Sequence, residues 1–543
     1  MTLHSRTGPQ VGATAPALAD NRRAISVAST TLLLVALTVV LFTALRSPLK
    51  DDIAWLLYVA RRWLAGRELY VDVIEVNPPL IIWISAIPIR IAGWMNTRPE
   101  TIAIPFFISA VLGCGGWAAC LLRGYSGLFA DRLPAFAALG TVLVVVPGMD
   151  LGQREHLLMA AILPYLVLYA CRLDGRRLHW AAALAAGVLA GFGCALKPPY
   201  VAAFVVLECL ALLRGPRLQG WGLHGWSLRG WGLRGAPFWV MPLAAAGTLA
   251  GYGALVLLTC PNYLHRAVPL ALALYGATDV PFLQLLGDSL RLLFGEAVAV
   301  LLWWWSRRWL PERNLMLTLV VFALASTVVC FVDGKDWFYH RLPATIATIL
   351  ALLLWIGSTL AHRRSMPLGK QRSFLLAAAV VVVVALAVAS YQRLQPEVEM
   401  AVQPDHSTVA RLEQIVREQH ARRYIAFSEW IALGFPVVNN TGVVWTSRFD
   451  SMWALKGELW RVKFDPSAEQ KFPVRHWVAR DFIAGCPDLA VVDLREGVNY
   501  IAVLSASDPD FARAWAHYRR IDAFDGLEVY RHDEAGCAGL PPT

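Results

Sequence analysis

The chain has 543 residues, of which 57% are hydrophobic and only 16% are charged. Soluble domains carry about 25% charged residues, so this composition excludes a soluble globular protein, a disordered chain and a coiled coil. The net charge of +10 comes from basic residues between apolar runs. That distribution follows the positive-inside rule, and it predicts a polytopic membrane protein rather than a nucleic-acid-binding one.

The N-terminal segment, residues 1–23, carries Arg6, Arg22 and Arg23 before a first apolar run at about 24–45. This run is too long for the apolar core of a signal peptide and has no evident small-residue cleavage site. We expect residues 1–23 to be a cytoplasmic tail and the run to be an uncleaved first span.

Ten further apolar runs approach the length of about 20 residues that a membrane-spanning helix needs. They are residues 102–122, 133–149, 157–171, 180–196, 198–213, 237–259, 289–305, 314–332, 342–360 and 373–390. The Arg- and Lys-rich loops alternate with them and are therefore cytoplasmic. Those loops are residues 123–132, 172–179, 213–235, 306–313 and 362–372. This parity predicts about eleven spans, with the N-terminus inside and the C-terminus outside.

The first outer loop is expected to contain two helices that lie at the membrane surface. Residues 53–65 alternate between apolar and basic faces. Residues 78–94 are apolar enough to span, but Pro88 and Arg90 interrupt them, and a span here would break the parity. We therefore expect an interfacial helix at 78–94, and a transmembrane domain over 24–390.

Residues 391–543 are mixed in polarity and predict a small periplasmic α/β domain. Helices are expected at 407–422 and 508–518, and strands at 424–427, 489–492 and 527–530. Its tryptophans are expected to be core residues more often than sugar-stacking platforms. Cys486 and Cys537 are the only cysteines of this part, in a compartment that permits disulfides, so we expect them to be bridged.

Three further features of the sequence do not point to a functional site. Residues 220–235 hold three short Gly-Trp repeats, which we interpret as a duplicated linker rather than a segment that binds lipid headgroups. The nine cysteines contain no CxxC pair, so a zinc site is not predicted. No nucleotide-binding loop of the GxGxxG or GxxxxGK[ST] type is evident.

Ionisable residues that gather where spans emerge are candidates for function, and the topology brings four such clusters to the outer side. The candidates are Asp51, Asp52, Arg154, Glu155, His156, Lys197, Tyr200, Lys335, Tyr339, His340 and Arg341. Each cluster has a structural explanation as well, as helix caps or as an aromatic belt with basic residues. Acids, a histidine and several cations on one membrane face nevertheless indicate an active site at the outer leaflet.

The first outer loop resembles that of GT-C fold glycosyltransferases. The likeness runs from Asp52 through Tyr70-Val71-Asp72 to Pro78-Pro79-Leu80. It is greatest for the branch of the lipid A aminoarabinose transferases, the protein O-mannosyltransferases and the rhizobial galacturonosyltransferases. In that family an Asp follows the first span and a second outer acid comes later, where Glu155 stands. The chain departs from the family at Asn77, where a basic residue is common, and at Glu155, where Asp is common.

The resemblance implies inverting transfer of a sugar from a polyprenyl-phosphate donor to a glycolipid, polysaccharide or protein at the periplasmic face of a bacterial inner membrane. Asp52, or alternatively Asp51, would be the general base, and Glu155 with His156 would orient the substrate. The other candidates would bind substrate or the leaving phosphate. No cofactor is expected to be required, although the adjacent acids could bind a divalent metal.

Two other classes of function remain open at this point. A transporter or flippase of a lipid-linked sugar would favour two-half symmetry and polar residues at mid-membrane, neither of which is evident. A polysaccharide polymerase or ligase would favour a large outer loop between late spans, whereas residues 260–288 form a modest one.

Overall fold

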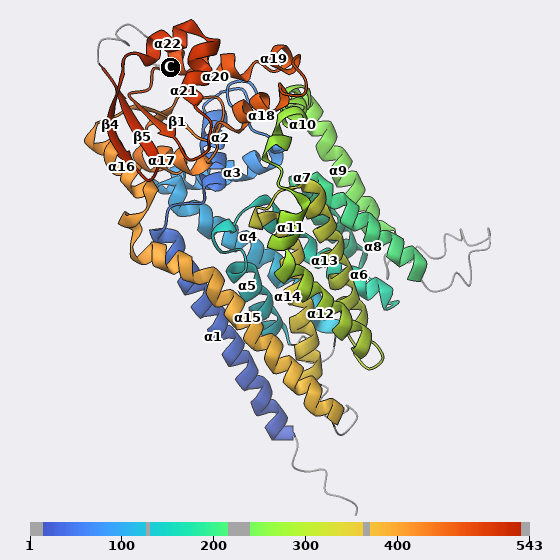
Figure 1. Ribbon diagram of the computed structural model, residues 1–543. Helices are drawn as coiled ribbons and strands as arrows, with labels where there is room; N and C mark the ends of the chain where they lie inside the picture. Colours follow the sequence, from blue (N-terminus) through green and yellow to red (C-terminus); the bar gives the residue numbers. More distant parts are fainter. Residues whose placement is uncertain (1–14, 126–130, 215–238, 362–369, 534–543) are drawn as a thin grey trace, which may run out of the picture.

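The structure is a computed structural model that describes residues 15–125, 131–214, 239–361 and 370–533. A long helical bundle carries a small α/β domain at one end, and the N-terminal end of α1 lies at the opposite end (Figure 1). The Gly-Trp repeats and Cys537 lie outside the described residues. The chain is a polytopic helical membrane protein.

A helix occupies each of the eleven segments that were predicted to span. They are α1 (Ala15–Arg46), α4 (Pro99–Leu121), α5 (Arg132–Val145), α6 (Arg154–Leu173), α7 (Trp180–Leu196), α8 (Val201–Arg214), α9 (Val240–Thr259), α12 (Leu290–Ser306), α13 (Arg313–Asp333), α14 (Phe338–Ala361) and α15 (Lys370–Val402). Seven of the described helices are long and apolar enough to cross a membrane by themselves. The shorter α5, α7, α8 and α12 run within the same bundle (Figure 1).

The outer segment 260–288 differs from the loop that was expected. It is almost wholly helical, with η6 (Tyr263–Ala267), α10 (Val268–Leu274), η7 (Tyr275–Thr278) and α11 (Phe282–Asp288). The parts before and after residue 280 meet at a bend of 78°. This bent segment lies under the α/β domain, because α10 and η7 pack against α18 (Trp453–Arg461).

The first outer loop contains the two expected helices, α2 (Asp51–Leu64) and α3 (Pro79–Met95). However, α2 does not lie on a free surface, since residues 53–60 are all buried. The Asn439 side chain donates a hydrogen bond to the Ala54 carbonyl at 3.1 Å, and the rings of Trp55 and Phe435 lie 5.0 Å apart. The C-terminal domain therefore covers α2, which the local pattern could not reveal.

The C-terminal domain is built on a five-stranded sheet in the order β2-β1-β3-β5-β4. Its strands are β1 (Arg423–Phe427), β2 (Val444–Trp445), β3 (Leu489–Asp493), β4 (Tyr518–Phe524) and β5 (Leu527–His532). The first three are parallel, and β5 and β4 add an antiparallel hairpin. The three predicted strands are β1, β3 and β5, whereas β2 and β4 were missed.

Seven described α-helices alternate with these strands along the chain and complete the domain. They are α16 (Thr408–Glu418), α17 (Val437–Thr441), α18, α19 (Ala468–Lys471), α20 (Val474–Gly485), α21 (Tyr500–Ser507) and α22 (Pro509–Trp515). The two predicted helices correspond to α16 and α22. Cys486 is disulfide-bonded, while its predicted pairing with Cys537 stays a prediction. The last span, α15, continues without a break to Val402, so a single helix leads from the bundle into the C-terminal domain.

Candidate active site

Asp52 lies in the first turn of α2, directly beyond the end of α1. The side chain of Asp51 accepts a hydrogen bond from the Asp52 amide at 2.9 Å and pairs with the Lys50 ammonium at 3.2 Å. From the start of α6, Gln153 Nε2 donates to Asp52 Oδ2 at 2.9 Å. The two outer clusters at 50–52 and 150–156 are therefore in direct contact.

The environment of Asp52 suits a group that exchanges protons. Burial raises the pKa of Asp52 to about 7, and the neighbouring charge of Asp51 adds to this shift. The cations Lys50 and Arg154 and the hydrogen bond from Gln153 oppose it. A carboxylate with this pKa can accept a proton at neutral pH, which is what general base catalysis requires.

Glu155 is fully buried and forms the centre of a second group of charges. Lys197 Nζ lies 3.1 Å from Glu155 Oε1 and 3.2 Å from Asp333 Oδ2. The ring of His340 lies 3.4 Å from the same Asp333 oxygen and 3.8 Å from Glu155. The ends of α6, α7, α13 and α14 that were predicted to lie outside thus meet at one ionic cluster, which explains why an acid without a partner in sequence is tolerated at Glu155.

Arg154 lies between the two groups. Its guanidinium donates a hydrogen bond to the Asn77 side chain, which ties it to the turn before the Pro-Pro pair. Its positive charge acts on the carboxylates of Asp52, Glu75 and Glu155. Arg154 is therefore the cation that faces both predicted catalytic acids.

Two further acids were not predicted. Glu75 is buried and accepts hydrogen bonds from the Trp55 indole and, at 2.8 Å, from the Asn77 amide; burial raises its pKa. Asp450 belongs to the C-terminal domain, and Trp453 Nε1 donates to it at 2.8 Å. Burial raises the pKa of Asp450 well above its usual range, and the charge of Glu75 adds to that shift.

The signals for these two acids differ. Glu75 is the only charged residue between Asp72 and Pro78-Pro79, and its position between apolar neighbours could have marked it. Asp450 has no local signal, because only the docking of the C-terminal domain brings it to the site. The Ile74 amide donates to the Arg448 carbonyl at 2.7 Å, and this backbone contact holds the loop of Asp450 over the first outer loop.

Two candidates make hydrogen bonds to backbone groups of the protein, and their predicted contact with substrate stays a prediction. His156 is fully buried; its Nδ1 accepts from the Gly152 amide at 3.1 Å and its Nε2 lies 2.8 Å from the Leu143 carbonyl. Both ring nitrogens are therefore used. Arg341 donates to the backbone carbonyls of Asp288 and Asp336 at 2.6 and 2.5 Å, so it holds the outer loops together.

The remaining candidates also make contacts within the protein, and their predicted binding of substrate stays a prediction. Lys335 Nζ donates to the Tyr275 carbonyl at 2.7 Å and pairs with Asp279 at 2.5 Å. Tyr200 donates to the His340 carbonyl at 2.8 Å, and Tyr339 is buried against the ring of His340 with centroids 4.7 Å apart. Within the described ranges, no group of three or more His, Cys, Asp or Glu side chains is placed to hold a metal ion.

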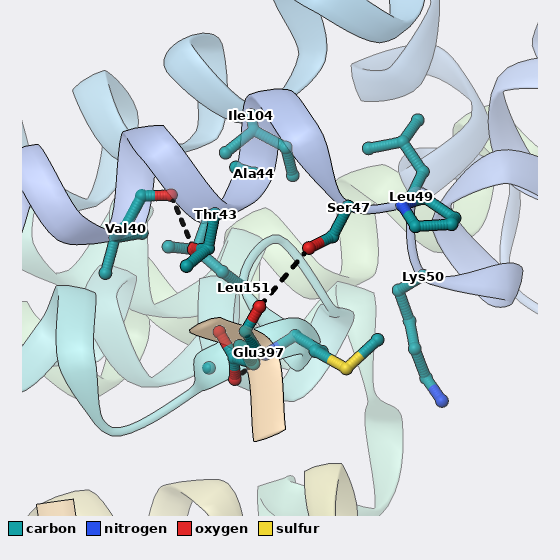
Figure 2. Close-up of a pocket in the computed structure, with 12 residues that line it drawn as sticks. Val40, Thr43, Ala44, Ser47, Leu49, Lys50, Ile104, Leu151 and Glu397 are labelled. Carbon is teal, nitrogen blue, oxygen red and sulfur yellow. Dashed lines mark hydrogen bonds between the residues drawn. The ribbon is translucent and has the colours of Figure 1, made fainter. Parts of the chain in front are cut away.

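A small pocket lies between the C-terminal part of α1, residues 47–50, α4, the 148–151 turn and α15 (Figure 2). Its walls are mainly apolar, with Lys50 and Glu397 as charged members. Glu397 Oε1 accepts from the Met149 amide at 2.7 Å, and Arg393 pairs with Asp150 at 2.6 Å. These contacts from α15 fix the turn that leads into Gln153 and Arg154.

The fold has a solved counterpart. A crystal structure of ArnT from Cupriavidus metallidurans bound to undecaprenyl phosphate matches 95% of this chain and 99% of that chain, with a TM-score of 0.52 and 13% sequence identity. The chain has a GT-C-like fold. The likeness covers the C-terminal domain as well as the bundle, whereas the sequence resemblance was confined to the membrane part. No protein-family model and no curated protein sequence matches the chain.

Proposed function

We propose that the chain is a membrane glycosyltransferase that moves a sugar from a polyprenyl-phosphate donor to an acceptor hydroxyl at the outer side of the membrane. The observation that carries the proposal is Asp52, a partly buried acid with a pKa of about 7 that is hydrogen-bonded to Gln153, two residues before Glu155. The GT-C-like fold supports it, as does the polyprenyl phosphate bound to the solved counterpart.

In the proposed reaction, Asp52 accepts the proton of the acceptor hydroxyl while the oxygen of that hydroxyl attacks the anomeric carbon of the donor sugar. The bond between that carbon and the phosphate oxygen breaks, and the lipid phosphate leaves with the electron pair. Attack from the face opposite the leaving group inverts the anomeric centre. The products are a glycoside and a free polyprenyl phosphate, so no nucleotide takes part.

The growing negative charge on the leaving phosphate needs fixed cations. Arg154 and Lys197 are two of the cations that lie next to the acids. Because Lys197 is held by Glu155 and Asp333, Glu155 would position a cation rather than exchange a proton itself. This role differs from the direct contact with the substrate that the sequence suggested.

The test is the substitution Asp52→Asn in full-length protein reconstituted with undecaprenyl-phosphate-linked sugars. Release of free undecaprenyl phosphate should fall by about 100-fold or more, the usual contribution of a general base. Binding of undecaprenyl phosphate, measured by native mass spectrometry, should persist. Asp72→Asn, in an exposed part of the same loop, is the matched control. Unchanged release in Asp52→Asn would favour a flippase or another non-catalytic role.

A further inference from the structure

A group of arginine and tryptophan side chains lies at the end of the bundle away from the candidate active site. Arg214 is the last residue of α8, and Trp303 lies in the last turn of α12. The opposite ends of these two helices border the site, because Lys197 lies shortly before α8 and Arg341 donates to the Asp288 carbonyl just before α12. The group therefore lies at the end whose loops were predicted to be cytoplasmic.

The indole of Trp303 brings two arginines of this group together. Its Nε1 donates to the Arg313 carbonyl at 3.0 Å, which fixes the ring at the start of α13. The guanidinium carbons of Arg214 and Arg307 lie 5.7 and 5.9 Å from the centroid of this ring, and that of Arg307 also lies 5.3 Å from the ring of Trp304. A guanidinium group held over an aromatic face keeps N–H groups at its edge that can bind a phosphate.

The two guanidinium groups have no carboxylate partner among the residues that the structure describes. Glu208, the acid of α8, is already paired with Arg172 at 2.6 Å. Glu312, the acid nearest to Arg307 in the sequence, is fully buried. The acids closest along the chain therefore do not neutralise Arg214 and Arg307, and both cations are available to an anion from outside the protein.

The group is also open to its surroundings. Arg214 is exposed and Arg307 is half-buried, and the side chain of Trp304 is 58% exposed. Residues 209–278 contain no Asp or Glu, so the chain that follows α8 brings no carboxylate to Arg214. Positive charge beside an exposed indole at the end of a membrane-spanning helix is typical of the membrane–water interface.

We propose that Arg214 and Arg307, held on Trp303, bind the phosphate of an anionic phospholipid headgroup in the leaflet opposite the candidate active site. The guanidinium edges donate to the phosphate oxygens, and Trp304 lies at the level of the headgroups. Basic clusters directly beyond a membrane-spanning helix attract anionic lipids. A soluble protein is the less suitable occupant, since it would have to displace the headgroups that surround the helix ends at this level.

The experiment measures lipid binding without turnover, so its outcome is independent of the proposed transferase function. Full-length protein, delipidated in detergent, is titrated with phosphatidylglycerol or with phosphatidylcholine, and bound lipid is counted by native mass spectrometry. We expect phosphatidylglycerol to bind about tenfold or more tightly than phosphatidylcholine, and the variant Arg214→Gln/Arg307→Gln to lose most of this preference. The control Arg132→Gln/Arg177→Gln removes the same charge from exposed arginines of loops predicted to lie at the same end, and it should keep the preference of the parent.

A second variant separates the guanidinium groups from net charge. Arg307→Lys keeps the charge but lacks the planar fork of donors, so it should weaken the binding of phosphatidylglycerol while its net charge equals that of the parent. Glycerol phosphate added at the concentration of the lipid should leave the bound lipid in place, because it lacks acyl chains in the bilayer or micelle.

Four outcomes would overturn the proposal. The parent protein binds the two lipids equally; Arg214→Gln/Arg307→Gln, or Arg307→Lys, binds phosphatidylglycerol as the parent does; or the control Arg132→Gln/Arg177→Gln loses as much preference as the test variant, which would mean that net charge alone attracts the lipid. The fourth is displacement of the lipid by glycerol phosphate, which would show that the site takes a soluble phosphate.

Discussion

Burial is the main reason that the pKa of Asp52 is raised, and the neighbouring charges modify this shift in both directions. A general base works only when ionised, so kcat/KM should rise with pH through about 7, the pKa to which burial and Asp51 bring this carboxyl. Below that pH Asp52 is protonated and cannot accept the hydroxyl proton. An ordinary carboxyl group, with a pKa of about 4, is ionised throughout the range from about pH 5 to pH 9. A kcat/KM that does not change over this range would therefore exclude the proposed role of Asp52.

The neighbours of Asp52 allow a sharper version of that measurement. Asp51→Asn removes a like charge that raises the Asp52 pKa, so the midpoint of the pH profile should move to lower pH. Lys50→Met removes an opposite charge that lowers the pKa, so the midpoint should move to higher pH. Shifts of the two variants in the same direction would show that the profile reports another group.

The ionic cluster around Glu155 gives a prediction for stability. Lys197→Met removes the cation that pairs with the buried carboxylate of Glu155 at 3.1 Å, and loss of one partner of a buried pair costs about 3–5 kcal/mol. The melting temperature of the full-length protein in detergent should therefore fall. The double variant Glu155→Gln/Lys197→Met should recover part of the loss, and the exposed Lys463→Met should lose nothing. A double variant less stable than Lys197→Met would argue against the pair.

At the level of elements, local hydropathy predicts where the helices lie, but small residues determine how closely two of them, α7 and α9, can pack. A Cβ atom on Gly187 would lie 2.4 Å from the Met241 carbonyl oxygen, and one on Gly191 would lie 2.7 Å from the Ala245 carbonyl oxygen. The spacing of the two glycines on α7 is that of small residues at close helix contacts in membranes. They let α7 pack directly against the backbone of α9.

This contact can be tested by adding one methyl group. Gly191→Ala should lower the melting temperature, because overpacking a close helix contact costs about 1–3 kcal/mol. Gly247→Ala on α9 is the matched control, since a Cβ there meets nothing within 4 Å; it should be neutral or slightly stabilising, because Ala favours a helix over Gly. Equal melting temperatures for the two variants would contradict the packing of α7 on α9.

At the scale of the whole molecule, the C-terminal domain packs directly against the candidate site. Its Asp450 shares an environment with Glu75 and Asp52, and its α18 packs on α10 and η7 of the bent segment 260–288. There Gly457 approaches so closely that a Cβ would lie 2.5 Å from the Leu274 carbonyl oxygen. The glycine thus allows the domain to dock at this distance.

Gly457→Val should push α18 away from the bent segment and shift the C-terminal domain, including Asp450, relative to Asp52. We expect kcat/KM to fall about tenfold or more, since small misplacements at a catalytic site are costly, while undecaprenyl phosphate still binds. Trp460→Val, at an exposed position of the same helix, should keep full activity. Parent-like activity in Gly457→Val would mean that docking of this domain does not govern the reaction.

Hydropathy and basic loops determined the larger part of this architecture from the sequence alone. The eleven apolar segments became helices, and the alternation of basic loops placed Asp52 and Glu155 towards the same end of the bundle, where Gln153 now links their neighbourhoods. These signals are local, because the length of an apolar run and the charges at its ends do not depend on which helix packs beside which.

Only the tertiary structure decided which side chains meet. It pairs Glu155 with Lys197, and it places backbone groups within hydrogen-bond distance of both ring nitrogens of His156. It also brings Asp450 of the C-terminal domain close to Glu75. No periodic pattern in the sequence predicts these contacts, because they join residues of different elements and not neighbours along one helix or strand. Burial then raises the pKa values of Glu75 and Asp450, and burial is a property of the packed molecule as a whole.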